Sequence, residues 1–233
     1  MRSFQIFSVG SFIPGLIVLL IFTSEHPGKM SSYRLLCLGD SYTIGEMVSR
    51  SENFPNQTIK LLNNDGYEFE DAKTIATTGW TTDELQVAID QHHFKTSYDF
   101  VTLLIGVNDQ YRGRTIEEYK PQFESLLKQA IYFANDKADH VIVLSIPDWG
   151  ITPFAKNSGR SQQQISKEID EYNEANKKIA GDHNVNYIDI TPSTREAVND
   201  VSLLAEDGLH PSSKEYAKWA QRLSAIIETV IKK

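Results

Sequence analysis

The chain has 233 residues, 40% of them hydrophobic, which is enough to bury the core of one ordinary domain and argues against global disorder. Its formal net charge is −8 and no cluster of Lys and Arg stands out, which argues against nucleic acid as the main partner because phosphate contacts need clustered cations. The single cysteine, Cys37, cannot form an internal disulfide, and we expect it to be a small buried residue.

The chain begins with an apolar leader. Residues 4–22 follow Arg2 and are mostly apolar, which is long for the core of a signal peptide and barely long enough to span a bilayer. No Ala-x-Ala cleavage pattern follows them. We therefore expect residues 1–29 to export the protein or anchor it to a membrane through 4–22. The alternative is a cytoplasmic protein whose translation starts at Met30.

Strand-like and helix-like stretches alternate after residue 30, which is typical of an α/β fold with a parallel sheet. Strands are predicted at residues 34–38, within 68–76, and at 100–105, 141–146 and 185–190. A helix is expected after each strand. We predict one domain over residues 30–233, a three-layer α/β/α sandwich whose five-stranded parallel sheet has the flavodoxin-like order 2-1-3-4-5.

Helix starts are marked by capping residues and prolines. Three helices are predicted to begin with a capping box, in which two side chains three residues apart cap each other's backbone: Thr81 with Glu84, Ser161 with Gln164, and Ser212 with Glu215. Pro55 is predicted to lie in the first turn of a helix that ends near Gly66. Pro121 is predicted to start a helix that runs to about Asn135, after a short turn capped by Thr115 and Glu118.

Four loops of this predicted fold hold residues suited to hydrolysis: Ser41, Gly79, Asn108, and Asp207 with His210. Each residue alone is weak evidence, since a serine or asparagine in a loop is commonly a turn residue. Three of the loops follow predicted strands, and the carboxyl ends of parallel strands meet at the edge where open α/β sheets place their active sites. The set therefore favours one site at this edge.

The chemistry gives each of these residues a role. Ser41 becomes a nucleophile only if a base removes its proton during the attack. His210 is the histidine with a carboxylate three residues earlier in a turn-like stretch, so Asp207 can bind one ring nitrogen while the other faces the serine. The backbone N–H groups of Ser41 and Gly79, with the side-chain amide of Asn108, are candidate donors to the oxyanion of a tetrahedral intermediate.

Four segments resemble the sequence blocks of the SGNH, or GDSL-type, hydrolases: Gly39-Asp40-Ser41-Tyr42, Gly79, Gly106-Val107-Asn108-Asp109 and Asp207-Gly208-Leu209-His210-Pro211. The resemblance runs from about residue 34 to the C-terminus. It implies a three-layer hydrolase that uses a Ser41-His210-Asp207 triad, with Ser41, Gly79 and Asn108 forming the oxyanion hole and with no metal or cofactor.

Two departures from related patterns bear on the substrate and on the fold. Tyr42 stands where the motif that names the family has leucine; this position is not catalytic, so the departure bears on the substrate pocket and not on the reaction class. The Gly-x-Ser-x-Gly pattern of the α/β-hydrolases is absent, because Thr43 stands where the second glycine would be.

We predict a serine esterase or lysophospholipase-type acylhydrolase that acts on a small-molecule or lipid carboxylic ester, with Tyr42 and Trp149 in the substrate pocket. A carbohydrate O-acetyl ester is the alternative within the same fold. A flavodoxin-like protein that binds FMN or phosphate through Ser41 is the alternative of another class, but it leaves Asp207 and His210 without a role. A related chain that only binds carbohydrate or lipid is a third reading.

Overall fold

The computed structural model describes residues 32–92, 94 and 97–233. The predicted leader, residues 1–29, lies outside the described residues. None of the helices in the described ranges is long and apolar enough to cross a membrane.

Five parallel strands form one sheet in the order β2-β1-β3-β4-β5, which confirms the predicted order. The strands are β1 (Leu35–Gly39), β2 (Lys73–Ala76), β3 (Phe100–Leu104), β4 (Val141–Leu144) and β5 (Asn186–Ile188). They lie within one or two residues of the predicted ranges, except that only the last four residues of 68–76 join the sheet and β5 is three residues long. Order 2-1-3-4-5 places the ends of β1 and β3 side by side, in register from Leu35 with Phe100 to Gly39 with Leu104.

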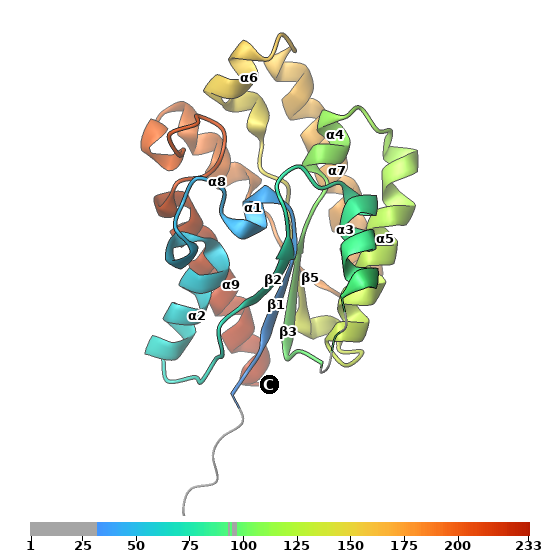
Figure 1. Ribbon diagram of the computed structural model, residues 1–233, viewed down its shortest axis with the longest axis vertical. Helices are drawn as coiled ribbons and strands as arrows, with labels where there is room; N and C mark the ends of the chain where they lie inside the picture. Colours follow the sequence, from blue (N-terminus) through green and yellow to red (C-terminus); the bar gives the residue numbers. More distant parts are fainter. Residues whose placement is uncertain (1–31, 93, 95–96) are drawn as a thin grey trace, which may run out of the picture. The chain divides into compact units, whose positions relative to one another are not determined.

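Helices cover both faces of the sheet and so form the three predicted layers. They are α1 (Ser41–Ile44), α2 (Phe54–Asn64), α3 (Thr82–Gln91), α4 (Val107–Tyr111), α5 (Ile116–Phe133), α6 (Pro153–Asn157), α7 (Gln162–Asp182), α8 (Thr191–Arg195) and α9 (Ser213–Ile231). Short 3-10 turns span Arg50–Glu52, Ala138–His140, Trp149–Ile151, Glu196–Val198 and Val201–Leu203. Helices α2 and α9 cover one face of the sheet, and α3, α5 and α7 cover the other (Figure 1).

The central strands are buried on both sides. Every residue of β1 and β3 is buried, which explains their nearly continuous apolar sequences. Cys37 lies in the middle of β1 and is fully buried, as expected. Burial raises the pKa of its thiol to about 12, so the thiol is neutral at pH 7 and is a packing group.

Of the three predicted capping boxes, the one at α3 is confirmed and the one at α7 is confirmed in part. At α3, the N–H of Thr81 donates to Glu84 Oε2 at 2.9 Å, which completes the predicted box. At α7, Ser161 Oγ accepts the N–H of Gln164 at 3.3 Å, so the serine caps the helix. The Gln164 side chain does not return the bond, because it donates to Glu168 one turn along the helix at 3.0 Å.

The predicted capping box at the start of α9 is wrong. Ser212 stands at the N-cap but makes no side-chain cap, and its hydroxyl donates to the carbonyl of Ser202 instead. Glu215 is buried, and its Oε1 accepts hydrogen bonds from the Trp219 indole at 2.9 Å and from the Ser193 hydroxyl at 2.5 Å. Packing the indole into the core requires an acceptor for its N–H, and this need outweighs a local cap.

The predicted start of a helix at Pro121 is also wrong. One helix, α5, begins at Ile116 behind the capping box of Thr115 and Glu118 and continues through Pro121. A proline inside a helix leaves the carbonyl four residues earlier without its N–H partner. Here that carbonyl belongs to Glu117, and both residues are exposed, so water can bind the carbonyl.

Candidate active site

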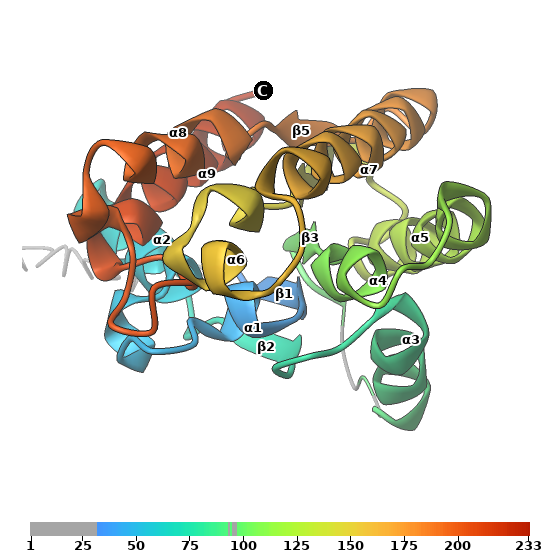
Figure 2. The same cartoon turned by 90° about the horizontal axis from the view of Figure 1, so that it is seen from above.

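The chain turns sharply from β1 into α1 at the carboxyl end of the sheet (Figure 2). Gly39 ends the strand at a position where a Cβ would lie 2.3 Å from the Leu104 carbonyl oxygen and 2.1 Å from Thr43 Oγ1, so no larger residue fits. Asp40 Oδ1 accepts the N–H of Tyr42 at 3.0 Å and caps α1. The first residue of the helix is Ser41, whose side chain is therefore held at this edge.

Ser41, His210 and Asp207 form a hydrogen-bonded chain. His210 Nε2 lies 3.0 Å from Ser41 Oγ, and Nδ1 lies 2.6 Å from Asp207 Oδ2. Asp207 Oδ1 also accepts the N–H groups of Leu209 and His210 at 3.0 Å each, which fixes the turn. Burial opposes ionisation of Asp207, but the bonds from His210 and from the two N–H groups outweigh it and keep the pKa of the carboxyl below its ordinary value. A charged carboxylate therefore faces the imidazole at neutral pH.

The other two predicted site residues lie on neighbouring loops. Gly79 has φ of +85°, a conformation that favours glycine. Asn108 follows β3 at the start of α4, and its Nδ2 donates to the Trp80 carbonyl at 2.9 Å. A side-chain amide has two N–H donors, so this bond orients the Asn108 amide and leaves its second N–H for a ligand.

A cavity of about 220 Å³ lies beside Ser41 and His210, and Gly79 and Asn108 also line it. Most of its wall is apolar and comes from Tyr42, Val107, Tyr111, Trp149, Phe154 and Leu209. Tyr42 and Trp149, the two residues predicted to contact substrate, are buried there, whereas Tyr111 and Phe154 are 50% and 39% exposed. The cavity can hold a small apolar group next to the serine.

Comparison with known families identifies the chain. The profile of the GDSL-like lipase/acylhydrolase family matches residues 37–218. The chain belongs to this family. This membership confirms the resemblance seen in the four sequence blocks and makes the protein a GDSL-type esterase or acylhydrolase. No curated protein matches the sequence.

Solved structures share the fold of this GDSL-type hydrolase at low sequence identity. An acetylxylan esterase from Geobacillus stearothermophilus is 20% identical, with a TM-score of 0.66 over 84% of this chain and 94% of that chain. A lipase/acylhydrolase from Enterococcus faecalis is 21% identical, with a TM-score of 0.62 over 86% of this chain and 95% of that chain. A psychrotrophic esterase from Pseudoalteromonas sp. is 16% identical, with a TM-score of 0.60 over 87% of this chain and all of that chain (100%). At these identities the likeness is one of fold.

The GDSL-type hydrolase has a second carboxyl group close to the serine. Asp40 is fully buried, and its Oδ2 has no hydrogen-bond partner among the described residues. Burial raises the pKa of Asp40 to about 8, the N–H of Tyr42 lowers it, and the charge of Asp109 raises it further. Asp40 is therefore mostly protonated at pH 7, and Asp207 is the carboxylate that faces His210.

The Trp149 wall of the cavity is held by residues that the sequence did not indicate. Its indole Nε1 donates to Gln110 Oε1 at 2.8 Å, and the Arg160 guanidinium lies 5.4 Å from the ring centre. Glu168 accepts from Gln110 at 2.5 Å and from Arg160 at 2.8 Å, which ties both supports together. The one signal in the sequence for this role of Gln110 is its position two residues after Asn108. The residues that support Trp149 lie far apart in the chain, on α4, on α7 and in the segment between α6 and α7.

Groups that could bind a metal ion were sought in the part of the chain that the structure describes. In residues 32–92, 94 and 97–233, no three or more His, Cys, Asp or Glu side chains are arranged to hold one.

Proposed function

We propose that the protein hydrolyses carboxylic esters by transferring the acyl group to Ser41 and then to water. The observation that carries the proposal is the hydrogen-bonded chain in which His210 Nε2 lies 3.0 Å from Ser41 Oγ and Nδ1 lies 2.6 Å from Asp207. A phosphate-binding role for Ser41 would leave this pairing unexplained.

The proposed reaction has two similar halves. As Ser41 Oγ attacks the ester carbonyl carbon, His210 Nε2 takes the hydroxyl proton and the Asp207 carboxylate stabilises the imidazolium. The carbonyl oxygen becomes an oxyanion that accepts hydrogen bonds from the N–H groups of Ser41 and Gly79 and from the Asn108 amide. His210 then gives its proton to the departing alcohol. Water repeats the sequence on the acyl-enzyme and releases the acid.

The cavity favours an ester with a small apolar acyl or aryl group. Its wall is mostly aromatic and aliphatic, and a hydrated sugar ring would lose hydrogen bonds to water on entering it. Deep burial of Trp149 and Tyr42 gives this wall a fixed shape. We therefore place the acyl part of the ester in the cavity and the alcohol part toward solvent.

Replacement of the serine tests this proposal. Ser41→Ala is expected to lower kcat for a nitrophenyl ester by about 10⁴-fold or more while the circular-dichroism spectrum is unchanged. The matched control is Ser51→Ala, which changes an exposed serine in the Arg50–Glu52 turn and is expected to keep full activity. Retained hydrolysis in the Ser41 variant would overturn the assignment of the nucleophile.

A further inference from the structure

Side chains of α4 bind the segment that carries Gly79. Asn108 Nδ2 donates to the Trp80 carbonyl at 2.9 Å, and Arg112, the residue at the C-cap of α4, donates from Nη2 to the Gly79 carbonyl at 2.7 Å. Residues four apart project from the same side of a helix, one turn from each other. One side of α4 therefore holds both carbonyls.

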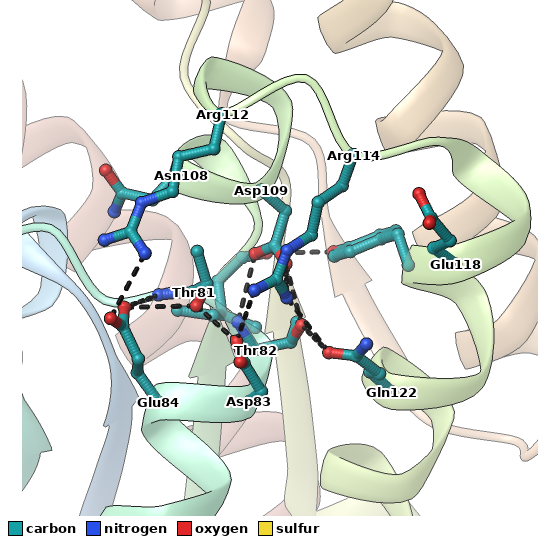
Figure 3. Close-up of polar contacts among 12 residues, drawn as sticks. Thr81, Thr82, Asp83, Glu84, Asn108, Asp109, Arg112, Arg114, Glu118 and Gln122 are labelled. Atoms are coloured by element: carbon teal, nitrogen blue, oxygen red, sulfur yellow. Dashed lines mark hydrogen bonds and ion pairs between the residues drawn. The ribbon is translucent and has the colours of Figure 1, made fainter.

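Asp109 binds the next part of the same segment, at the start of α3. Its buried carboxylate accepts the Thr82 N–H at Oδ2 (3.0 Å), and its Oδ1 lies 2.8 Å from the Thr82 hydroxyl, which is also 2.7 Å from Gln122 Oε1. Arg114 donates to Oδ1 at 3.0 Å and supplies a positive charge to the buried group. Figure 3 shows the contacts of Asp109 with Thr82 and with Arg114. The N-terminus of α3 is thus bound to α4, and so is the Gly79 carbonyl.

Arg112 also reaches the remaining residue of the segment, through Glu84. Its Nη1 lies 3.1 Å from Glu84 Oε1, and Glu84 Oε2 accepts the N–H of Thr81 at 2.9 Å (Figure 3). Each of the residues 79–82 is therefore tied to α4: Trp80 and Thr82 bond to its side chains, Gly79 bonds to Arg112, and Thr81 bonds to Glu84, the partner of Arg112. The segment takes its position from α4.

We propose that Arg112 and Asp109 are positioning residues that fix the Gly79 N–H and the Asn108 amide relative to each other. This inference rests on the proposed function, in which both groups bind the oxyanion. The donors lie on different loops, and they stabilise the transition state only when both lie about 2.7–3.1 Å from the developing charge. Neither Arg112 nor Asp109 lines the cavity, so each acts through the groups it holds.

The test of Arg112 uses a variant that keeps the apolar stem. Arg112 is 46% exposed, so Arg112→Met is expected to fold normally. We expect kcat to fall by about tenfold with KM changed less than twofold, because misplacement by about 1 Å can cost up to 10²-fold in rate. The matched control is Arg222→Met, since exposed Arg222 also donates to a backbone carbonyl, that of Asp189 at 2.6 Å, and is expected to keep full activity.

The test of Asp109 replaces its partner Thr82 and leaves Asp109 in place, because replacing a buried carboxylate risks unfolding the protein. Thr82→Val removes the hydroxyl, which contacts both Asp109 Oδ1 and Gln122 Oε1, and keeps the backbone N–H that Asp109 accepts and the side-chain shape. We expect kcat to fall by about tenfold or less, since one of the two bonds between Thr82 and Asp109 is lost and the backbone bond remains. Thr82→Ser restores the hydroxyl and is expected to return kcat to within about twofold of the parent.

A trifluoromethyl ketone separates positioning from a structural role. Ser41 Oγ bonds to its carbonyl carbon, the carbonyl electron pair moves to oxygen, and the serine proton passes to His210, which leaves an oxyanion in place of the transition-state charge. In Arg112→Met and Thr82→Val, its inhibition constant should rise by the same factor as kcat/KM falls. The corresponding secondary alcohol cannot form the oxyanion and should bind as it does to the parent protein.

The possible outcomes separate the inference from the proposed function. Normal kcat in Arg112→Met and Thr82→Val, or equal losses for the ketone and the alcohol, would overturn the positioning role while an inactive Ser41→Ala leaves the proposed function intact. A rise in KM alone would also overturn it. Full activity in Ser41→Ala would instead refute the proposed function.

Discussion

At the scale of single residues, the Asp207 carboxylate determines which nitrogen of His210 faces the serine. Asp207 Oδ2 lies 2.6 Å from Nδ1, so a neutral imidazole that carries its proton on Nδ1 presents Nε2 to Ser41 Oγ at 3.0 Å. The same carboxylate accepts two backbone N–H groups, so its place does not depend on the histidine. The 207–210 turn thus sets the orientation of the proposed base.

Asp207→Asn is expected to lower kcat by about 10³–10⁴-fold with little effect on the fold, because an amide can donate to Nδ1 and favour the wrong tautomer. Steady-state assays with a nitrophenyl ester measure the fall in kcat. Asp182→Asn changes an exposed aspartate that pairs with Lys178 on α7 and serves as the control. A variant with more than a tenth of the parent kcat would contradict this role of Asp207.

The buried Asp40 carboxyl predicts a pH dependence of stability. Its pKa is about 8 in the folded protein against 3.8 as the ordinary value, so between these pH values the folded state holds a proton that the unfolded state has lost. The free energy of unfolding therefore falls as the pH rises through this window, by up to about 1.4 kcal/mol per pH unit from this group. Asp40→Asn, which keeps an oxygen to accept the Tyr42 N–H, should lose this contribution.

Urea unfolding at pH 5, 6, 7 and 8 checks the effect of Asp40. At each step to higher pH, the free energy of unfolding of the parent should fall relative to that of Asp40→Asn. A difference that is constant over the series would show that Asp40 is ionised in the folded protein below pH 5.

At the scale of elements, α4 is a short helix whose successive side chains contact different parts of the site. Asn108 binds the Trp80 carbonyl, Asp109 binds Thr82, and Gln110 binds the Trp149 indole. Its sequence position after β3 predicted that Asn108 lies at this edge of the sheet, since a strand end is readable from an apolar run. The partners of Asp109 and Gln110 are not readable, because they come from segments that meet only in the folded chain.

Gln110→Leu is expected to destabilise the protein by about 1–3 kcal/mol, because the indole N–H of buried Trp149 loses its acceptor. Urea unfolding measures the change, and Gln163→Leu, at an exposed position of α7, is the control for adding an apolar side chain. Equal stability of the Gln110 variant and the parent would mean that another group or water accepts the N–H.

Local sequence patterns predicted the elements well where tertiary packing agreed with them. The strands of the sheet and the capping box at Thr81 are of this kind. Local reasoning failed at Pro121, whose exposed position tolerates a lost hydrogen bond, and at Glu215, which the Trp219 indole recruits into the core. In both places contacts with solvent or with distant residues decided the structure.

At the scale of the whole molecule, strand order assembles the site from distant parts of the chain. The order 2-1-3-4-5 brings the loops after β1, β2, β3 and β4 to one edge, and the 207–210 turn before α9 completes it. The sequence predicted this convergence from the alternation of elements and from the family resemblance. The size of the cavity depends on how Trp149, Tyr111 and Phe154 pack, which no local pattern encodes.

The cavity predicts a preference for short apolar acyl groups. Along a series of nitrophenyl esters, each added methylene that fits should raise kcat/KM about threefold to fourfold, and the gain should end when the 220 Å³ cavity is filled. Trp149→Ala should move the optimum to longer chains. A parent enzyme with equal kcat/KM from acetyl to decanoyl would show that the acyl group lies outside the cavity.

The proposed function depends on attack by Ser41 on the substrate, with His210 as its base. A nitrophenyl phosphonate tests it most directly, because attack forms a stable Oγ–phosphorus bond and releases nitrophenolate. Mass spectrometry of the intact protein and of its peptides should find one phosphonyl group, on Ser41, with no labelling of Ser41→Ala and labelling slowed about 100-fold or more in His210→Ala. A phosphonyl group on another residue, or an unlabelled protein that still hydrolyses esters, would show that Ser41 is not the nucleophile.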